Sequence, residues 1–288
     1  QFLQEAGARL AGFDGVIQGN VPIGSGVSSS AAMEVASAMA WTHLLGLTFE
    51  KKALALLCQK AENKFVGVNC GIMDQFVSVF GAAGHAVLID CRSLQHELVP
   101  FDASRAVVLV CNTGVKRELA TSAYNERRAQ CEEAVRRLSR RYAGISALRD
   151  VSVAQFQAAA DDLPQPVRRR ARHVVTENQR ALDSVQALRQ GNLAEFGRLM
   201  NESHESLRHD YEVTCRELDV MVDLARSVRG TYGSRMTGAG FGGCTVSLVS
   251  PDAVDEFRQR VAAGYREAIG LAADISVVVP ADGAGRVA

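Results

Sequence analysis

One stretch near the start of the chain decides how the rest is interpreted: Pro22-Ile23-Gly24-Ser25-Gly26-Val27-Ser28-Ser29-Ser30-Ala31-Ala32. Strong helix formers follow it to Leu45, so we expect a loop over Pro22–Ser30 that opens a helix. The free N–H groups of a helix start favour an anion, and glycine lets the backbone approach it closely. The stretch contains neither the GK[ST] of a Walker A loop nor a GxSxG elbow. A phosphate loop and a flexible, serine-capped turn both remain open.

Apolar spacing and turn formers along the rest of the chain predict a mixed α+β protein. The helices are expected at Ala31–Leu45, Phe49–Val66, Gly71–Phe80 and Pro251–Ile269, with long amphipathic helices from Lys116 to Arg229. We expect breaks in this helical region near Gly144, Pro164–Pro166, Gly191–Asn192 and Tyr211–Thr214. The strands are expected at Phe13–Val21, Ala86–Asp90, His96–Pro100, Ala106–Asn112, Tyr232–Met236, Cys244–Val249 and Ile275–Val279. The change in pattern near Ser104 predicts two domains, 1–104 and 105–288.

The amino-acid composition limits the kinds of molecule that the protein is expected to bind. The 288 residues are 47% hydrophobic and 22% charged, with 32 basic and 32 acidic side chains, so no net field favours nucleic acid or an anionic membrane. Apolar runs such as Ala53–Cys58 are too short to cross a bilayer. The seven cysteines form no CxxC pair, which argues against a disulfide framework or a zinc site. We expect reduced thiols, a cytoplasmic location, a monomer, and no nucleic-acid or membrane partner.

Together with the serine-rich loop, three further motifs resemble one family. The loop is similar to the ATP loop of the GHMP small-molecule kinases, and the rest narrows the resemblance to the galactokinases. These motifs are Ala61-Glu62-Asn63 with Asn69-Cys70-Gly71-Ile72-Met73-Asp74-Gln75-Phe76, then Tyr124-Asn125-Glu126-Arg127-Arg128-Ala129-Gln130-Cys131-Glu132, then Gly233-Ser234-Arg235-Met236-Thr237-Gly238-Ala239-Gly240-Phe241-Gly242-Gly243-Cys244. They occur in the family's order and span most of the chain.

The resemblance implies a fold and an activity. The fold would be α+β with two domains, the first like the second domain of ribosomal protein S5 and the second ferredoxin-like with added helices. The activity would be transfer of the γ-phosphoryl group of ATP to the C1 hydroxyl of galactose. The substrates would be galactose and ATP, and the cofactor Mg²⁺.

The resemblance also implies roles for individual residues. The ATP phosphates would lie on Gly24, Ser25, Gly26, Val27, Ser28, Ser29 and Ser30. Ser30 and Glu62 would hold Mg²⁺, which prefers oxygen ligands and keeps several waters. Asp74 would act beside the C1 hydroxyl as a base or an orienting carboxylate, and Lys116 would offset phosphate charge. Gly71 and Tyr124 would contact the sugar.

Taken one at a time, these residues have plainer interpretations. Glu62 and Asp74 are single carboxylates on helical patterns, which a solvated helix face would explain. Tyr124 is suited to packing between helices, and Lys116 to an ordinary surface position. Only the combination favours the functional interpretation.

Several other motifs are excluded by context or spacing. Gly238–Gly243 fits GxGxxG, but a strand follows it where a dinucleotide site needs a helix. Relatives usually carry glycine in place of Ala239, which would cost energy there if the position needs positive φ. His204 and His209 lie five residues apart, about 140° around a helix, so we expect helix-face residues rather than a metal pair. The arginine runs at 136–141 and 168–172 are expected on solvated helix faces.

Two rivals share these motifs. An N-acetylgalactosamine kinase would differ in the room at the sugar C2 substituent. A non-catalytic galactose- and ATP-sensing regulator would have lost residues from the serine–alanine loop, whereas Ser28–Ala32 is intact. Galactokinases also carry an Arg-x-Asn-(Leu/Ile)-Ile-Gly-Glu-His-x-Asp-Tyr segment upstream of the ATP loop, and this sequence lacks it. We therefore expect a truncated first domain, poor galactose binding, slow turnover and aggregation by these 288 residues alone.

Overall fold

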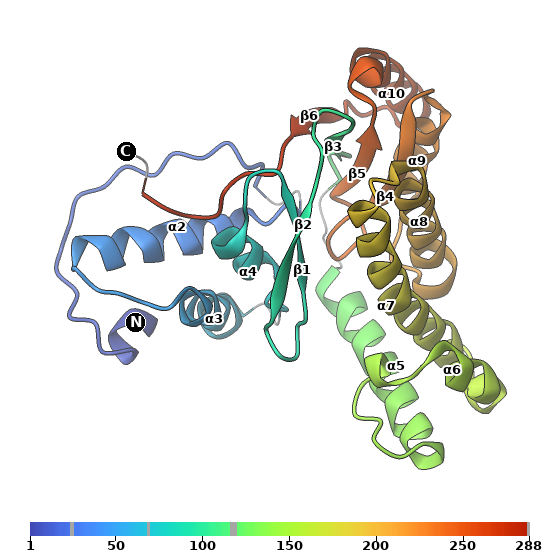
Figure 1. Ribbon diagram of the computed structural model, residues 1–288, viewed down its shortest axis with the longest axis horizontal. Helices are drawn as coiled ribbons and strands as arrows, with labels where there is room; N and C mark the ends of the chain where they lie inside the picture. The colour runs from blue at the N-terminus through green and yellow to red at the C-terminus, as the bar shows by residue number, and fades with distance from the viewer. Residues whose placement is uncertain (24–25, 68–69, 116–119, 287–288) are drawn as a thin grey trace. The chain divides into compact units, whose positions relative to one another are not determined.

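The computed structural model describes the whole chain except residues 24–25, 68–69, 116–119 and 287–288 (Figure 1). The chain forms two compact units. Unit 1 comprises Gln1–Ala103 with Val279–Ala288, and unit 2 comprises Ser104–Val278. A compact unit need not fold on its own, so the division into two domains, 1–104 and 105–288, stays a prediction.

Unit 1 combines helices with one β-hairpin (Figure 1). Its helices are α1 (Phe2–Glu5), α2 (Ser29–Leu44), α3 (Lys51–Ala61), a π-helical turn (Glu62–Val66) and α4 (Met73–Phe80). The hairpin strands β1 (His85–Ile89) and β2 (His96–Pro100) pair antiparallel, with Val87 opposite Leu98. Buried residues from α2, α3 and α4, among them Val35, Leu54 and Phe76, form the core. Except for α1, which was not predicted, these elements confirm the predicted helices and hairpin strands within a few residues.

The predicted strand at Phe13–Val21 is wrong. Residues 8–20 have no regular structure, and Val16 and Ile17 are 97% and 74% exposed. The alternating pattern suits a strand, but a strand also needs a neighbour for its backbone groups. Among the described residues of unit 1, the only strands are β1 and β2, which pair with each other. Phe13 instead packs edge-on against the Trp41 ring, with centroids 4.5 Å apart.

Unit 2 is built on an antiparallel sheet of β3 (Val107–Asn112), β4 (Thr231–Met236), β5 (Cys244–Val249) and β6 (Asp274–Val278). The spatial order is β4-β5-β3-β6. Helices separate β3 from β4 and β5 from β6, which is the split βαβ arrangement of ferredoxin-like folds. The ferredoxin-like expectation is therefore confirmed.

Two helices pack against this sheet: α9 (Arg216–Ser227) and α10 (Val254–Ile269), which follows a 3₁₀ turn (Pro251–Ala253). The core joins Leu109 of β3, Met221 of α9 and Phe257 of α10, all fully buried. Tyr265 is also fully buried, and its hydroxyl donates a 2.9 Å hydrogen bond to the carbonyl of Thr113.

The remaining helices of unit 2 are α5 (Ala120–Arg141), α6 (Val153–Ala159), α7 (Val167–Arg189), α8 (Leu193–Ser206) and a π-helical turn (Leu207–Tyr211). Short 3₁₀ turns occupy Leu148–Asp150 and Ala160–Asp162. A separate core under α5, α6 and α7 contains Leu138, Phe156 and Leu163. The predicted breaks all fall between elements.

Helix α8 meets strand β4 backbone to backbone. A Cβ built on Gly197 would lie 2.1 Å from the carbonyl oxygen of Tyr232, and one on Gly233 would lie 2.1 Å from that of Gly197. Only glycine at both positions permits this approach. The contact fixes α8 against the strand that leads into the glycine loop 237–243.

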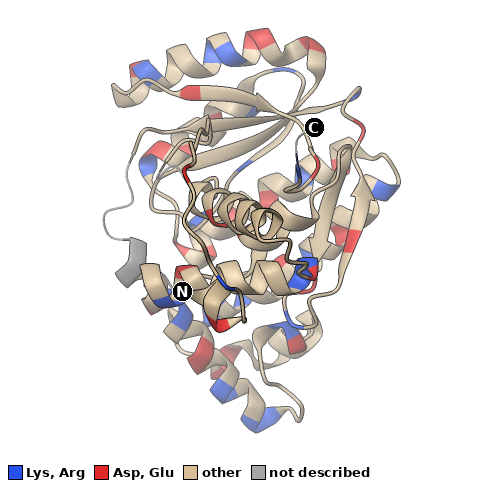
Figure 2. Ribbon diagram, turned by 90° about the vertical axis from the view of Figure 1, so that its left-hand side faces the viewer, with Lys and Arg blue, Asp and Glu red and all other residues tan. Residues whose placement is uncertain are grey.

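Charged residues of both signs alternate along the helices (Figure 2). The described part of the chain contains no helix that is both long and apolar enough to span a bilayer.

Candidate active site

The described part of the serine-rich loop opens helix α2, as predicted. Gly26 has φ +82°, and Ser28, the residue before the helix, also adopts a left-handed conformation with φ 65°. The Ser28 side chain makes no capping hydrogen bond, so the first N–H groups of α2 are not capped by their own serine. Gly24 and Ser25 lie outside the described residues. A helix of 16 residues with such a start is suited to an anion.

Ser30 and Glu62, the predicted magnesium ligands, are brought together although they are 32 residues apart. The Ser30 hydroxyl donates a hydrogen bond of 2.5 Å to Oε2 of Glu62. Glu62 is 8% exposed, whereas Ser30 is open to solvent. A hydroxyl and a carboxylate are hard oxygen donors, which are the ligands that Mg²⁺ prefers.

A second carboxylate, Glu34, completes this arrangement and was not predicted. Its carboxyl group is hydrogen-bonded to Glu62, and Nε2 of Gln75 donates to its Oε2 over 3.0 Å. Burial, followed by the contact with Glu62, raises the pKa of Glu34 to about 8. The spacing from Ser30 to Glu34 is one helical turn, which puts both on one face of α2. This spacing was the feature of the sequence from which Glu34 could have been predicted as part of the site.

Asp74 lies in the first turn of α4, close to the same group. Burial, followed by the charges of Glu62, Glu34 and Asp74, raises the pKa of the Cys70 thiol. All three carboxylates therefore lie within electrostatic range of one sulfur atom. Asn63 fixes the position of Cys70 by accepting a hydrogen bond from its backbone N–H over 3.1 Å. We call Glu34, Glu62 and Asp74 the acidic cluster.

The acidic cluster has no protein counter-ion among the described residues. No arginine or lysine of that part of the chain forms an ion pair with Glu34, Glu62 or Asp74, while most other ion pairs lie on the helices of unit 2. Lys116, predicted as a catalytic cation, falls outside the described residues.

The remaining predicted sugar contacts are both accessible. Gly71, just before α4, is exposed, and a Cβ built on it would meet nothing within 4 Å. Tyr124 is on α5 of unit 2, and its side chain is 39% exposed. Both residues are therefore open to a ligand.

The glycine loop 237–243 of unit 2 leads from β4 directly into strand β5, which confirms the predicted strand after the loop. Ala239 is not among the residues with positive φ, so alanine is not strained there. Phe241 is the non-glycine residue of this loop with a positive φ, of 59°, and its N–H donates a 2.7 Å hydrogen bond to the carbonyl of Val213. Gly240 has no room for a side chain, because a Cβ would lie 2.1 Å from the same oxygen.

Arginine side chains hold the segment Tyr211–Val213, whose Val213 carbonyl contacts this loop. Glu212 has φ 55°, and Arg127 donates to its carbonyl and to that of Tyr211. Arg170 is 2% exposed and pairs with the Glu212 carboxylate. The expectation of a solvated face is therefore wrong for Arg170. Its guanidinium donates hydrogen bonds to Gln130, to the carbonyl of Asp210 and to Glu212.

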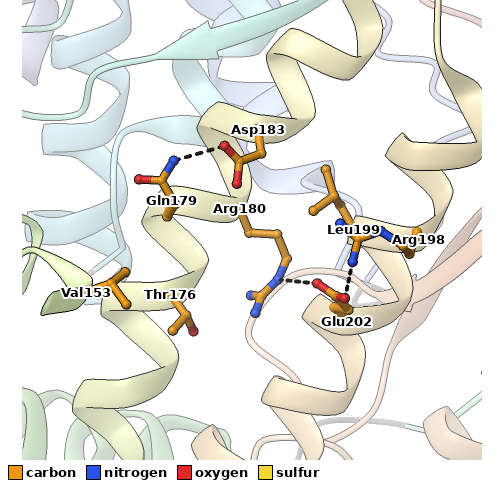
Figure 3. A pocket seen from close by; sticks show the side chains of 8 residues that line it. All are labelled: Val153, Thr176, Gln179, Arg180, Asp183, Arg198, Leu199 and Glu202. Atoms are coloured by element: carbon orange, nitrogen blue, oxygen red, sulfur yellow. Dashed lines mark hydrogen bonds and ion pairs between the residues drawn. The ribbon is translucent and has the colours of Figure 1, made fainter. Parts of the chain in front are cut away.

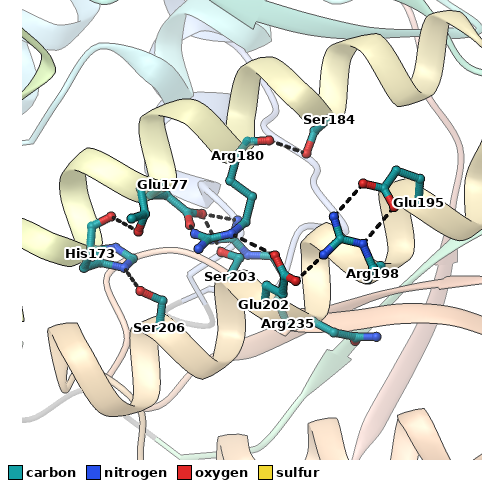
Figure 4. A network of polar contacts seen from close by, with 12 residues as sticks. His173, Glu177, Arg180, Ser184, Glu195, Arg198, Glu202, Ser203, Ser206 and Arg235 are labelled. Atoms are coloured by element: carbon teal, nitrogen blue, oxygen red, sulfur yellow. Dashed lines mark hydrogen bonds and ion pairs between the residues drawn. The ribbon is translucent and has the colours of Figure 1, made fainter. Parts of the chain in front are cut away.

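A polar network joins α7, α8 and β4 in unit 2 (Figure 4). Glu177 accepts hydrogen bonds from Ser203, Arg180 and Arg235. Burial alone would raise the pKa of Glu177, but the charge of Arg235 and the Ser203 hydrogen bond hold it below its usual value. We call Glu177, Arg180, Ser203 and Arg235 the arginine–glutamate network.

Two histidines are buried near this network. His173 hydrogen-bonds Ser206 over 3.0 Å, and burial lowers its pKa to about 4. His204 lies on α8, as expected, and it is fully buried. Its Nδ1 accepts from the N–H of Met236, and its Nε2 lies 3.3 Å from Asp219. His209 is exposed, and the described residues contain no group of three or more histidine, cysteine, aspartate or glutamate side chains that could hold a metal ion.

A pocket of about 190 Å³ opens beside the network, between α7 and α8 (Figure 3). Arg180 and Arg198 line it, and both pair with Glu202. Asp183 also lines the pocket and accepts a hydrogen bond from Nε2 of Gln179.

Comparison with models of protein families identifies the class of protein to which the chain belongs. The model of the GHMP kinases N terminal domain matches residues 1–82, and that of the GHMP kinases C terminal domain matches residues 184–267. Both units of the chain thus contain a matched region.

Individual relatives narrow the family. The galactokinase of Roseiflexus sp. (strain RS-1) is 55% identical over 99% of this chain and 73% of its own length. That of Fusobacterium nucleatum subsp. nucleatum is 47% identical, over 96% and 72%. The crystal structure of Lactococcus lactis galactokinase complexed with galactose superposes with a TM-score of 0.93 at 39% identity, covering 99% of this chain and 74% of that one. The chain belongs to the galactokinase family of the GHMP kinases.

Proposed function

We propose that this protein transfers the γ-phosphoryl group of ATP to the C1 hydroxyl of galactose. The observation that carries the proposal is the joining of Ser30 to Glu62 beside Asp74, at the start of α2, in a chain of the galactokinase family. We also infer a cytoplasmic monomer with small-molecule partners. The seven free thiols support the location.

The nucleotide and its cation are assigned to the start of α2. The loop residues Gly24–Ser30 would surround the phosphates, with the N–H groups of the first helical turn directed at them. Ser30 and Glu62 would hold Mg²⁺, which neutralises phosphate charge when bound. Glu62 is already aligned by the Ser30 hydroxyl, so this ligand pair needs little rearrangement.

Asp74 is assigned to the sugar hydroxyl. It lies in the first turn of α4, and its charge acts on the same Cys70 thiol as the charges of Glu34 and Glu62. Because phosphoryl transfer depends mainly on alignment and charge, orienting the hydroxyl is as valuable as removing its proton. Gly71 and Tyr124 would contact the sugar, and Lys116 would offset charge on the transferred group.

The test is a coupled ADP-release assay with galactose, with N-acetylgalactosamine and without sugar, followed by NMR identification of the product. We expect galactose-dependent ADP release and galactose 1-phosphate. Preference for N-acetylgalactosamine would identify the rival kinase. ATP binding without ADP release under any condition would contradict the proposed catalysis and favour the sensor.

A further inference from the structure

We propose that Asn63 and Gln59 are positioning residues for the proposed sugar site. Their side-chain amides fix the backbone of Cys70, which directly precedes the predicted sugar contact Gly71. This inference rests on the proposed function and deepens it. Neither residue is among the predicted catalytic, nucleotide-binding, sugar-binding or metal-binding residues.

Both backbone polar groups of Cys70 are held by side chains of the preceding helical segment. Oδ1 of Asn63 accepts a hydrogen bond from the Cys70 N–H over 3.1 Å and a second from the Cys70 thiol over 3.3 Å. Nε2 of Gln59 donates to the Cys70 carbonyl over 3.2 Å. Cys70 lies outside the helices and strands, so the two amides take the place of the backbone partners that regular structure would provide.

The local structure of the chain brings both amides to Cys70. Gln59 lies in the last turn of α3 and Asn63 in the π-helical turn, and their spacing of four residues puts them close to one face of the helix. Gly67 ends this turn with φ 85°, a left-handed conformation that glycine adopts without strain. Its N–H donates to the Glu62 carbonyl over 3.0 Å. The chain leaves the helix at Gly67 and returns to it at Cys70.

The segment after Cys70 carries the predicted sugar residues. Ile72 is 5% exposed and packs in the core of unit 1, and its carbonyl accepts the N–H of Phe76 over 2.9 Å. Gly71 is exposed between the fixed Cys70 and the buried Ile72. Asp74 follows in the first turn of α4. A displacement of Cys70 would therefore move the predicted sugar contact and reach the predicted catalytic carboxylate.

The same contacts join two parts of the proposed site. Asn63 directly follows Glu62, the proposed cation ligand that accepts a hydrogen bond from Ser30. The Asn63 side chain thus links the segment that carries the cation ligand to the segment that carries Asp74. Phosphoryl transfer depends mainly on alignment of the reacting groups. We therefore expect loss of the Asn63 acceptor to slow turnover without removing a ligand of the cation.

Two substitutions of Asn63 separate the hydrogen bond from packing. N63L has a similar volume but no acceptor, whereas N63D keeps the shape and an oxygen acceptor for the Cys70 N–H. Because a misplacement of about 1 Å can cost about 10²-fold in rate, kcat for galactose-dependent ADP release should fall by about 10- to 100-fold in N63L. N63D should recover part of that loss. Q59M, which removes the other hydrogen bond at similar volume, should also lower kcat.

Measurements besides kcat distinguish positioning from a merely structural role. Mn²⁺ affinity in the presence of ATP and without sugar, followed by electron paramagnetic resonance, should stay within about threefold of wild type in N63L, because no ligand is removed. Thermal unfolding of each variant checks the fold. Hydrogen exchange of the Cys70 amide, followed by NMR, should be faster in N63L than in wild type. N20A, at an exposed asparagine of unit 1, is the control and should match wild type throughout.

A kcat within a few-fold of wild type in folded N63L would overturn the inference, and the same result in Q59M would overturn it for Gln59. A loss of Mn²⁺ affinity equal to the loss of kcat would also overturn it, because Asn63 would then act on the cation site. Equal kcat in N63D and N63L would exclude the acceptor as the cause. Absence of galactose-dependent ADP release by wild type would instead contradict the proposed function. The exchange measurement needs no turnover, and unchanged exchange in N63L would overturn the fixing of Cys70 even then.

Discussion

The acidic cluster of unit 1 and the arginine–glutamate network of unit 2 use the same side chain in opposite ways. Glu177 is surrounded by donors, with Arg180, Arg235 and Ser203 all directed at its carboxylate. Glu62 faces a second carboxyl group and one hydroxyl, with no lysine or arginine paired to it among the described residues. A carboxylate that is paired with cationic side chains of the same protein stabilises the fold. A carboxylate that is held in place but has no such cationic partner is suited to bind an external cation.

The largest expected effect lies in the acidic cluster. In D74N the fold should be retained, because the half-buried side chain changes little in volume, while the group that we propose to lie beside the sugar hydroxyl loses its charge. General-base groups contribute about 10²–10⁴-fold, so kcat should fall by that factor. Steady-state ADP release with galactose measures it. A kcat within a few-fold of wild type would remove Asp74 from the chemistry.

The next effect concerns acid stability near the network. His173 is held neutral with a folded pKa of about 4, below its ordinary 6.5, so the unfolded chain binds the extra proton first. Stability should therefore fall as pH drops from about 6.5 to 4, by up to about 3 kcal/mol from this residue. The charged groups that act on it are Glu177, Asp210, Arg180 and Arg235.

The comparison with H173N isolates that contribution, since other titrating groups are common to both proteins. Denaturant unfolding at pH 7 and pH 4.5 should show a smaller loss in H173N than in wild type. An equal loss would mean that His173 is protonated in the folded protein.

A smaller effect is expected from E177Q, which keeps the shape but removes the charge between two arginines. Hydrogen bonds to charged groups contribute about 1.5–3 kcal/mol, so the free energy of unfolding should fall by about 2 kcal/mol. Mn²⁺ affinity should not change. An unchanged denaturant midpoint would show that the network does not stabilise unit 2.

The smallest effect comes from the matched control E195Q. Glu195 pairs with Arg198 on the exposed side of α8, with an N–O distance of 2.5 Å. Solvent screens such pairs, so we expect no measurable change in the denaturant midpoint. A shift as large as that of E177Q would mean that burial does not separate the two pairs.

The sequence predicted most elements because apolar periodicity and turn formers act locally. It failed at Phe13–Val21, since strand pairing depends on a distant partner. Ser30 and Glu62 could be named only through family motifs. Glu34 and Arg170 could not be named, because a single charged residue on an amphipathic helix has the same pattern whether it faces solvent or a buried partner.

The contrast between Glu177, which is paired with arginines, and Glu62, which is not, is tested most directly by Mn²⁺ binding in the presence of ATP. The proteins to compare are E62Q and E177Q. The account predicts that E62Q weakens Mn²⁺ binding at least about tenfold while E177Q leaves it unchanged. Equal affinity of E62Q and wild type would contradict the account.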